Sequence, residues 1–188
     1  LWGGRFRGDE DARMQHFNSE CWRTSWLVEP DIQGSLAHVA MQVKCGLLPS
    51  AEGEALTRGL ETILADFKAG QRVYTEEYED VHTFVELHLI RRVGDVGKKL
   101  HTARSRNDQC QVDGRLYVRK EIGEILEGLK YLESVILDKA EKYADSISIG
   151  FTHLQHAQPL TIGFMFMAYF QMFKRDILRL QDTLDRMN

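Results

Sequence analysis

Cysteine and proline are scarce in this chain: its 188 residues include only three of each. Cys21, Cys45 and Cys110 are scattered, and no CxxC or Cys/His pair has the spacing of a metal site. The sequence therefore predicts free thiols in a reducing compartment rather than a disulfide framework. Fifteen glycines beside so few prolines also argue against a collagenous or disordered chain.

Long apolar runs and an excess of positive charge are missing as well. The longest apolar stretch, residues 162–173, is too short to cross a bilayer and is interrupted by Gln171. Residues 1–7 lack the apolar centre of a signal peptide. The formal net charge of −4 gives no electrostatic reason to expect nucleic acid. We therefore expect a cytoplasmic protein with no membrane and no nucleic-acid partner.

Helical periodicity is what the chain does have. Apolar residues recur at helical spacing in residues 31–45 and again in 51–67, where Ser50 is a candidate N-cap. A third helix is expected over about residues 79–93. No alternation of apolar and polar residues is long enough to predict a sheet. With 43% hydrophobic residues available for a core, the predicted fold class is all-α.

Two long helices are expected after residue 110, because apolar residues follow heptad spacing there. The two seams comprise Val118, Ile122, Ile125, Leu129, Leu132 and Ile136 in the first helix, and Phe166, Phe170, Phe173, Ile177, Leu180, Leu184 and Met187 in the second. The predicted domains are an N-terminal helical domain, 1–110, and the first two long helices of a bundle, 111–188. Because no cap ends the second helix, we expect a truncated bundle or a chain that needs partners.

A polar run at residues 98–109 separates a glycine-containing loop from the first long helix. Asn107 or Asp108 could cap that helix, but a cap does not account for Arg104 and Arg106. These arginines could form a solvated charge cluster. They could also form a carboxylate clamp, since arginine binds carboxylates bidentately and a helix N-terminus favours anions.

A second polar run, residues 152–159, lies in the segment that joins the two long helices. Thr152 and His153 are adjacent there, and histidine is the commonest proton-transfer residue near neutral pH. His156 is a rival for this role, although it need not share the same pocket.

The acidic pair Glu79 and Asp80, followed by His82, is a weaker signal. The two carboxylates can favour a helix start through the helix dipole alone. His82 could also donate a hydrogen bond into a pocket.

In these segments the chain resembles the argininosuccinate lyase family of the fumarase/aspartase superfamily. The matching segments keep the family order along the chain, and they are residues 1–6, 31–35, 79–82, 99–109 and 152–159. The arginine-serine-arginine-asparagine-aspartate-glutamine run at 104–109 is the more specific match, because other superfamily members share the histidine pattern.

The resemblance implies an all-helical enzyme that assembles as a homotetramer, with active sites shared between subunits. It implies a carbon–nitrogen lyase that reversibly eliminates fumarate from argininosuccinate, giving arginine in arginine biosynthesis and the urea cycle. It implies a small-molecule substrate, no cofactor and no metal. The site residues that it implies are a catalytic His153 and substrate-binding Arg106, Asn107, Thr152, Asp80 and His82.

Two features depart from the family pattern. Glu20 stands where a substrate-binding serine is expected, and Ser19 could replace that serine only if the backbone shifts. The family's glycine- and serine-rich loop, with the catalytic serine and a nearby lysine, is absent from these residues, so we expect the chain alone to be inactive. Two alternatives stay open: another aminosuccinate carbon–nitrogen lyase of the superfamily, and a non-catalytic structural protein like the lens crystallins recruited from this family.

Overall fold

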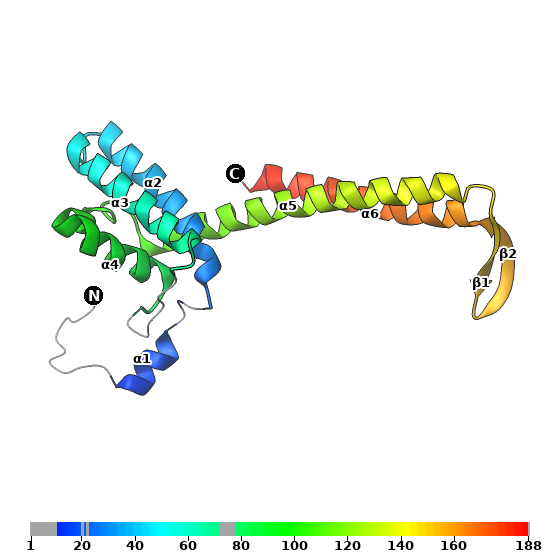
Figure 1. Cartoon of the computed structure of the whole chain (residues 1–188), viewed down its shortest axis with the longest axis horizontal. Coiled ribbons are helices and arrows are strands. Elements are labelled where there is room, and N and C mark those ends of the chain that lie inside the picture. Colours follow the sequence, from blue (N-terminus) through cyan, green and yellow to red (C-terminus); the bar gives the residue numbers. More distant parts are fainter. Residues whose placement is uncertain (1–10, 20, 22, 72–77, 188) are drawn as a thin grey trace. The chain divides into compact units, whose positions relative to one another are not determined.

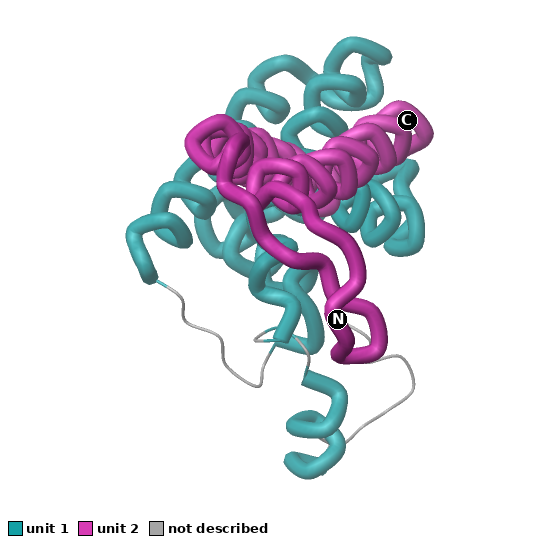
Figure 2. The backbone as a smooth tube through the Cα atoms, turned by 90° about the vertical axis from the view of Figure 1, so that its right-hand side faces the viewer, with its two compact units in different colours: residues 1–117 teal, residues 118–188 magenta. Residues whose placement is uncertain are grey.

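The computed structural model describes residues 11–19, 21, 23–71 and 78–187, and its elements are almost all helices (Figure 1). In chain order they are α1 (Ala12–Asn18), the 3-10 turn η1 (Ser25–Leu27), α2 (Val28–Lys44), α3 (Ser50–Lys68), α4 (Val81–Val93), the 3-10 turn η2 (Gly94–Lys99), α5 (Arg106–Lys142), β1 (Ile147–Thr152), β2 (Gln155–Thr161) and α6 (Ile162–Arg186). The chain divides into two compact units, residues 1–117 and 118–188 (Figure 2). The all-α prediction is confirmed, with one small hairpin added.

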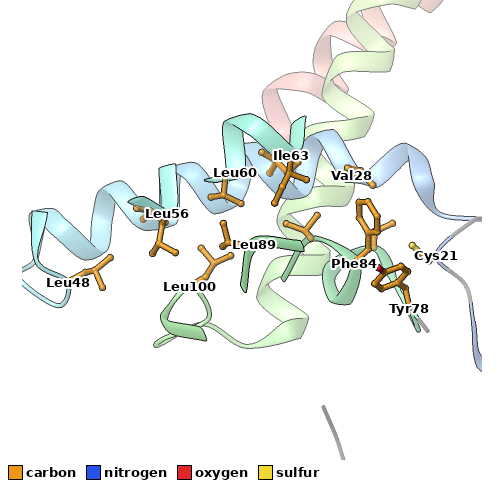
Figure 3. Packing of buried hydrophobic residues seen from close by; sticks show 14 residues of the cluster. Cys21, Val28, Leu48, Leu56, Leu60, Ile63, Tyr78, Phe84, Leu89 and Leu100 are labelled. Carbon is orange, nitrogen blue, oxygen red and sulfur yellow. The ribbon is translucent and has the colours of Figure 1, made fainter. Parts of the chain in front are cut away.

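Helices α2, α3 and α4 enclose the apolar core of the first unit (Figure 3). Each helix contributes one face at three- and four-residue spacing, as an amphipathic helix must when one side is buried. The residues of this core include Val28, Ile32, Val39, Leu56, Leu60, Ile63, Val81, Phe84, Val85 and Leu89. Gly59 lets α3 approach α4, because a Cβ at that position would lie 2.6 Å from Cδ1 of Leu89.

The helix ends in this unit follow short-range signals. Gly46 and Gly70, with φ of 72° and 84°, come shortly after the ends of α2 and α3. Ser50 is not the N-cap of α3 as predicted: it is the first helical residue, and Pro49 occupies the cap position. The predicted helix over about 79–93 is α4, and the carboxylate of Asp80 caps it by accepting the N–H of Thr83 at 2.7 Å.

Helix α5 begins with a reciprocal cap. The hydroxyl of Ser105 accepts the N–H of Asn107 at 3.2 Å, and the carboxylate of Asp108 accepts the N–H of Ser105 at 3.0 Å. This is a capping box, which satisfies two backbone donors that a helix start would otherwise leave free. The predicted cap, Asn107 or Asp108, is therefore wrong: Ser105 is the cap, and Asp108 completes the box. Arg106 becomes the first residue of the helix.

In the second unit, α6 packs on α5 through one apolar seam. The buried members are Ile122, Leu126 and Ile177, with Leu129, Leu180, Leu184 and Met187 packed against them. The seam predicted for α6 is confirmed at four of its members. On α5 the predicted register is partly wrong, because Val118, Ile125 and Leu132 are exposed while Leu126 is buried. Helix α5 has apolar residues on two faces, and spacing alone does not show which one meets α6.

The connection between α5 and α6 is an antiparallel hairpin, although the sequence predicted no sheet. Strand β1 pairs with β2, with an irregularity between Ile149 and Phe151, and the pair Thr152–Gln155 closes a two-residue turn. Most residues of both strands are exposed, so no buried face imposed the alternation that reveals a strand in a sequence. Helix α6 then begins at Ile162, capped by Thr161. None of the described helices is both long enough and apolar enough to span a membrane.

Candidate active site

A cluster of ionisable side chains is buried in the first unit, where α2, α4 and the start of α5 supply its members. Asp31, His82 and Asp113 are 0%, 4% and 1% exposed. The Nδ1 atom of His82 lies 2.9 Å from Oδ1 of Asp31 and 3.4 Å from Oδ2 of Asp113. A Cβ on Gly34 would lie 3.3 Å from Oδ1 of Asp113, so the small residue on α2 leaves room for this carboxyl group.

The contacts of His82 indicate where its ring carries a hydrogen. Oδ1 of Asp31 also accepts a hydrogen bond from the amide of Gln109, so it acts as an acceptor, and Nδ1 of His82 is the donor. The other ring nitrogen, Nε2, lies 3.3 Å from Sγ of Cys110 and can accept the thiol hydrogen when the ring is neutral. Both ring nitrogens are thus engaged within the first unit.

Asp113 holds its proton at neutral pH. Burial, and after it the charge of the adjacent Asp31, raise the pKa of the Asp113 carboxyl to about 8, and Arg104 and Arg106 oppose the rise. Among the described residues, neither oxygen of Asp113 has a hydrogen-bond partner, and Oδ2 of Asp31 has none either. A proton on Asp113 relieves the repulsion between two close carboxyl groups.

Two arginines face this cluster, Arg104 from the loop before α5 and Arg106 from the first position of that helix. The guanidinium of Arg104 donates to Oγ of Ser35 at 3.2 Å, and burial lowers the pKa of Arg104. Arg106 donates from Nη1 to Oε1 of Gln109 at 3.0 Å. Because an arginine keeps its proton at any ordinary pH, both side chains supply positive charge beside the aspartate pair.

Arg106 also has two acidic neighbours at longer range. Its Nε lies 3.9 Å from Oδ2 of Asp80, and its Nη2 lies 3.8 Å from Oε2 of Glu86. Neither distance is a hydrogen bond. This half-buried guanidinium has five N–H donors on a planar fork and one side-chain hydrogen bond within the described part of the chain. It can therefore still bind a ligand carboxylate.

Asp80, the carboxylate 3.9 Å from Arg106, lines a surface cavity of about 530 Å³. Its lining residues are His16, Phe17, Asn18, Arg23, Glu79 and Asp80. The cavity is large enough for a small acid. Asp80 therefore lies between this cavity and Arg106. The side chain of Asn107 is exposed at the same helix start.

Ser19, which the sequence offered as a replacement for the family's serine, already has a hydrogen-bond partner in the first unit. Ser19 is buried, and its hydroxyl donates to the backbone carbonyl of Tyr78 at 3.0 Å. It therefore stabilises the first unit instead of facing a ligand. Position 20, where the glutamate stands, lies outside the described residues.

Thr152 and His153 belong to the second unit, at the tip of the hairpin. His153 and Leu154 have φ of 51° and 63°, the left-handed values of a type I′ turn, and neither is a glycine. Such a backbone costs of order 1 kcal/mol for each residue, and strain of this kind is concentrated at functional sites. Both side chains are exposed. The rival His156 has its ring edge-on to Phe151 at 5.1 Å, across the hairpin.

The structure groups the predicted residues in two sets. Asp80, His82, Arg106 and Asn107 lie in the first unit, and Gln109 and Asp31 connect Arg106 to His82 through hydrogen bonds. Thr152 and His153 lie in the second unit. The sequence analysis missed the following members of the cluster: Asp31, Glu86, Gln109 and Asp113. The available signal was an acidic residue on the apolar face of a helix, since Asp31 is followed by the buried Ile32, Ser35 and Val39.

Among the described residues, Asp31, His82 and Asp113 have donor atoms close enough together to hold a metal ion, within 4.8 Å of one another. Nδ1 of His82 is already a hydrogen-bond donor in this arrangement, and Oδ1 of Asp31 accepts two hydrogen bonds. A metal would have to displace these bonds. The geometry is that of a hydrogen-bonded network.

Comparison with known proteins places these features in a family context. A protein-family model described as "Lyase" matches residues 4–188. The chain is 48% identical over 185 residues to argininosuccinate lyase of Clostridioides difficile (strain 630), which covers 98% of this chain and 42% of that protein. It is 49% identical over 188 residues to argininosuccinate lyase of Alkaliphilus metalliredigens (strain QYMF), covering 100% and 41%. The chain thus spans about two fifths of the length of these curated relatives.

Solved structures show the same fold. EDDS lyase in complex with formate has a TM-score of 0.73 at 27% identity, covering 87% of this chain and 32% of that one. A fumarate lyase from Mesorhizobium sp. BNC1 has a TM-score of 0.71 at 21% identity, covering 100% and 42%, which supports the fold alone.

Proposed function

We propose that this chain is part of an argininosuccinate lyase. The premise is that the chain belongs to the lyase family, whose model matches residues 4–188. The observation that carries the proposal is the identity of 46–49% with argininosuccinate lyases along 98–100% of this chain. The reaction is the reversible elimination of fumarate from argininosuccinate, which releases arginine. Because the chain covers about two fifths of those enzymes, we infer that it supplies part of each active site.

The chemistry requires charge stabilisation at a carboxylate. Removing a proton beside a carboxylate creates a dianionic, aci-carboxylate-like species, and fixed donors directed at it lower the barrier. Arg106 and Asn107 supply such donors at the start of α5, where the helix dipole also favours an anion. Thr152 adds a hydroxyl from the hairpin. Asp80 and His82 complete the proposed substrate-binding set, Asp80 at the cavity and His82 through the hydrogen bonds that lead from Asp31 and Gln109 to Arg106.

Proton transfer is the second requirement. When the carbon–nitrogen bond breaks, its electrons leave with the guanidine nitrogen, which must gain a proton, while the adjacent carbon loses one. His153 is the proposed catalytic residue, as the acid or as a proton relay. The partner base is the serine of a loop that these 188 residues do not contain, and the reverse assignment of acid and base stays open. The reaction consists of proton transfers and one bond cleavage, so it requires neither a cofactor nor a metal.

Assembly as a homotetramer is proposed from the apolar surface of the long helices. Several large apolar side chains of α5 and α6 are exposed outside their shared seam, including Val118, Ile125, Leu132, Met165, Tyr169 and Met172. Apolar surface of this extent on two helices favours burial in a larger bundle. Active sites shared between subunits would then bring the hairpin of one subunit to the site of another. The free state of Cys21, Cys45 and Cys110 supports a reducing, cytoplasmic location.

The direct test is substrate profiling of the protein, expressed from its gene with any sequence that follows Asn188. Argininosuccinate is expected to be cleaved, with fumarate detected by its ultraviolet absorbance and arginine by amino-acid analysis. Adenylosuccinate and EDDS serve as competing aminosuccinate-type substrates. Preferential cleavage of one of these would support the alternative lyase, for which Glu20 is the motivating feature. A folded oligomer that cleaves none of them would support the crystallin-like alternative.

A further inference from the structure

The side chain of Gln109 forms one hydrogen bond to Asp31 of the buried cluster and another to Arg106. Its Nε2 donates to Oδ1 of Asp31, and its Oε1 accepts Nη1 of Arg106 at 3.0 Å. The side chain is 4% exposed. Arg106 and Gln109 are three residues apart on the first turn of α5, a spacing that places two side chains side by side on a helix.

The two partners of Gln109 explain why a carboxamide is required at this position. Oδ1 of Asp31 accepts hydrogen bonds, and a guanidinium only donates them. A side chain that bonds to both must offer a donor at one end and an acceptor at the other, as a carboxamide does. A carboxylate of the same length would place an acceptor against Asp31, and an aliphatic side chain would leave buried polar groups unpaired. The amide therefore has one productive orientation.

Asp31, at the other end of this series of hydrogen bonds, is fixed in the interior of the first unit. Asp31 is fully buried and accepts a hydrogen bond from Nδ1 of His82 at 2.9 Å. Because Asp31 is fixed in this way, it keeps Gln109 in place even if the side chain of Arg106 moves. Arg106 itself has two competing carboxylates nearby, Asp80 at 3.9 Å and Glu86 at 3.8 Å. Without the bond to Gln109, its guanidinium is free to close onto either of them and lose the donors that a substrate needs.

We propose that Gln109 is a positioning residue that holds the Arg106 guanidinium open for the substrate carboxylate and away from Asp80 and Glu86. Gln109 does not contact the substrate, and it acts through Arg106. The kinetic part of this inference depends on the proposed lyase function, whereas the geometric part does not.

A double-mutant cycle tests the kinetic part. In the protein expressed from its gene, Gln109→Met keeps the length of the side chain and removes both hydrogen bonds. We expect kcat/KM for argininosuccinate to fall about 10- to 100-fold, the range for losing a hydrogen bond to a charged group. In an Arg106→Ala background the same change should cost less than about twofold, because contacting residues that act as a unit are not additive.

Gln42→Met is the matched control, since it removes another buried amide of the first unit, one that donates to the carbonyl of Thr102 at 3.1 Å. Its effect on kcat/KM should be equal in the two backgrounds. Equal losses for Gln109→Met in both backgrounds would overturn the inference, because the glutamine would then act independently of Arg106. Unchanged kcat/KM in Gln109→Met would also overturn it.

Crystal structures of the wild type and Gln109→Met separate this inference from the proposed function. We expect the Arg106 guanidinium of the variant within hydrogen-bond distance of Asp80 or Glu86, whichever substrate the enzyme uses. An unmoved guanidinium would overturn the positioning role even if argininosuccinate is cleaved. A protein that cleaves no argininosuccinate but shows the displaced guanidinium would refute the proposed function and keep the geometric inference.

Discussion

Replacing Asp113 with asparagine tests the buried acid of the candidate site. Burial and the charge of Asp31 raise the pKa of this carboxyl from its ordinary value of 3.8 to about 8. Between these two values the unfolded chain has released the proton and the folded chain has kept it, so stability falls as the pH rises, by about 1.4 kcal/mol per pH unit. Below the lower value both states are protonated, and the stabilisation is fully present.

Asparagine keeps the shape of the protonated acid and a donor that can face Asp31, but it has no proton to lose. We therefore expect the free energy of unfolding of Asp113→Asn, relative to wild type, to rise by about 2 kcal/mol between about pH 6 and pH 8, since the slope decreases near the folded pKa. Urea unfolding followed by tryptophan fluorescence measures this difference. All three tryptophans lie within the first 26 residues, so the signal reports on the first unit.

The control for this experiment is Asp95→Asn. Asp95 is exposed, and its hydrogen bond to Lys98 lowers the pKa of its carboxyl, so this group stays ionised in both states across that range. The difference between Asp95→Asn and wild type should stay constant from pH 6 to pH 8. A constant difference for Asp113→Asn as well would show that the folded protein does not hold a proton on Asp113 in this range.

Three further outcomes are expected. Ser105→Ala removes the cap of α5 and should lower the free energy of unfolding by about 1 kcal/mol in urea titrations, whereas no loss would contradict the capping box. Gly59→Ala should cost about 1–3 kcal/mol in the same assay, because the new methyl would lie 2.6 Å from Leu89, and a neutral effect would show that α3 and α4 pack less closely. His153→Asn should lower kcat about 10²- to 10⁴-fold and His156→Asn much less; the reverse order would refute the catalytic assignment.

The helices of the first unit could be predicted because each buries one apolar face, and periodicity detects such a face. The same method missed Asp31 and Asp113, since a pattern of apolar residues treats a buried carboxyl as an interruption. Their pairing requires α2 and α5 to meet, which no local pattern reports. The polar run at 104–109 could be recognised, but not which of its residues bond inward: Gln109 is buried, whereas Asn107 is exposed.

The hairpin and the register of α5 could not be predicted for opposite reasons. The strands are largely exposed, so their residues carry little alternation, and their turn has His153 and Leu154 where a glycine is typical of a type I′ turn. In helix α5, by contrast, apolar residues occupy more than one face, so the pattern does not identify the buried one. Its exposed stripe and its buried stripe satisfy the same spacing rule, and only the position of α6 separates them.

Arg106 is expected to bind the substrate carboxylate, and kcat/KM of Arg106→Ala for argininosuccinate measures this role. Loss of an oxyanion-type donor predicts a decrease equivalent to about 2–4 kcal/mol of transition-state binding. Arg92→Ala is the control, because Arg92 pairs with Asp66 at the surface of the first unit, and its loss should leave kcat/KM within about twofold. A folded Arg106→Ala enzyme whose turnover and affinity match those of the wild type would contradict this role.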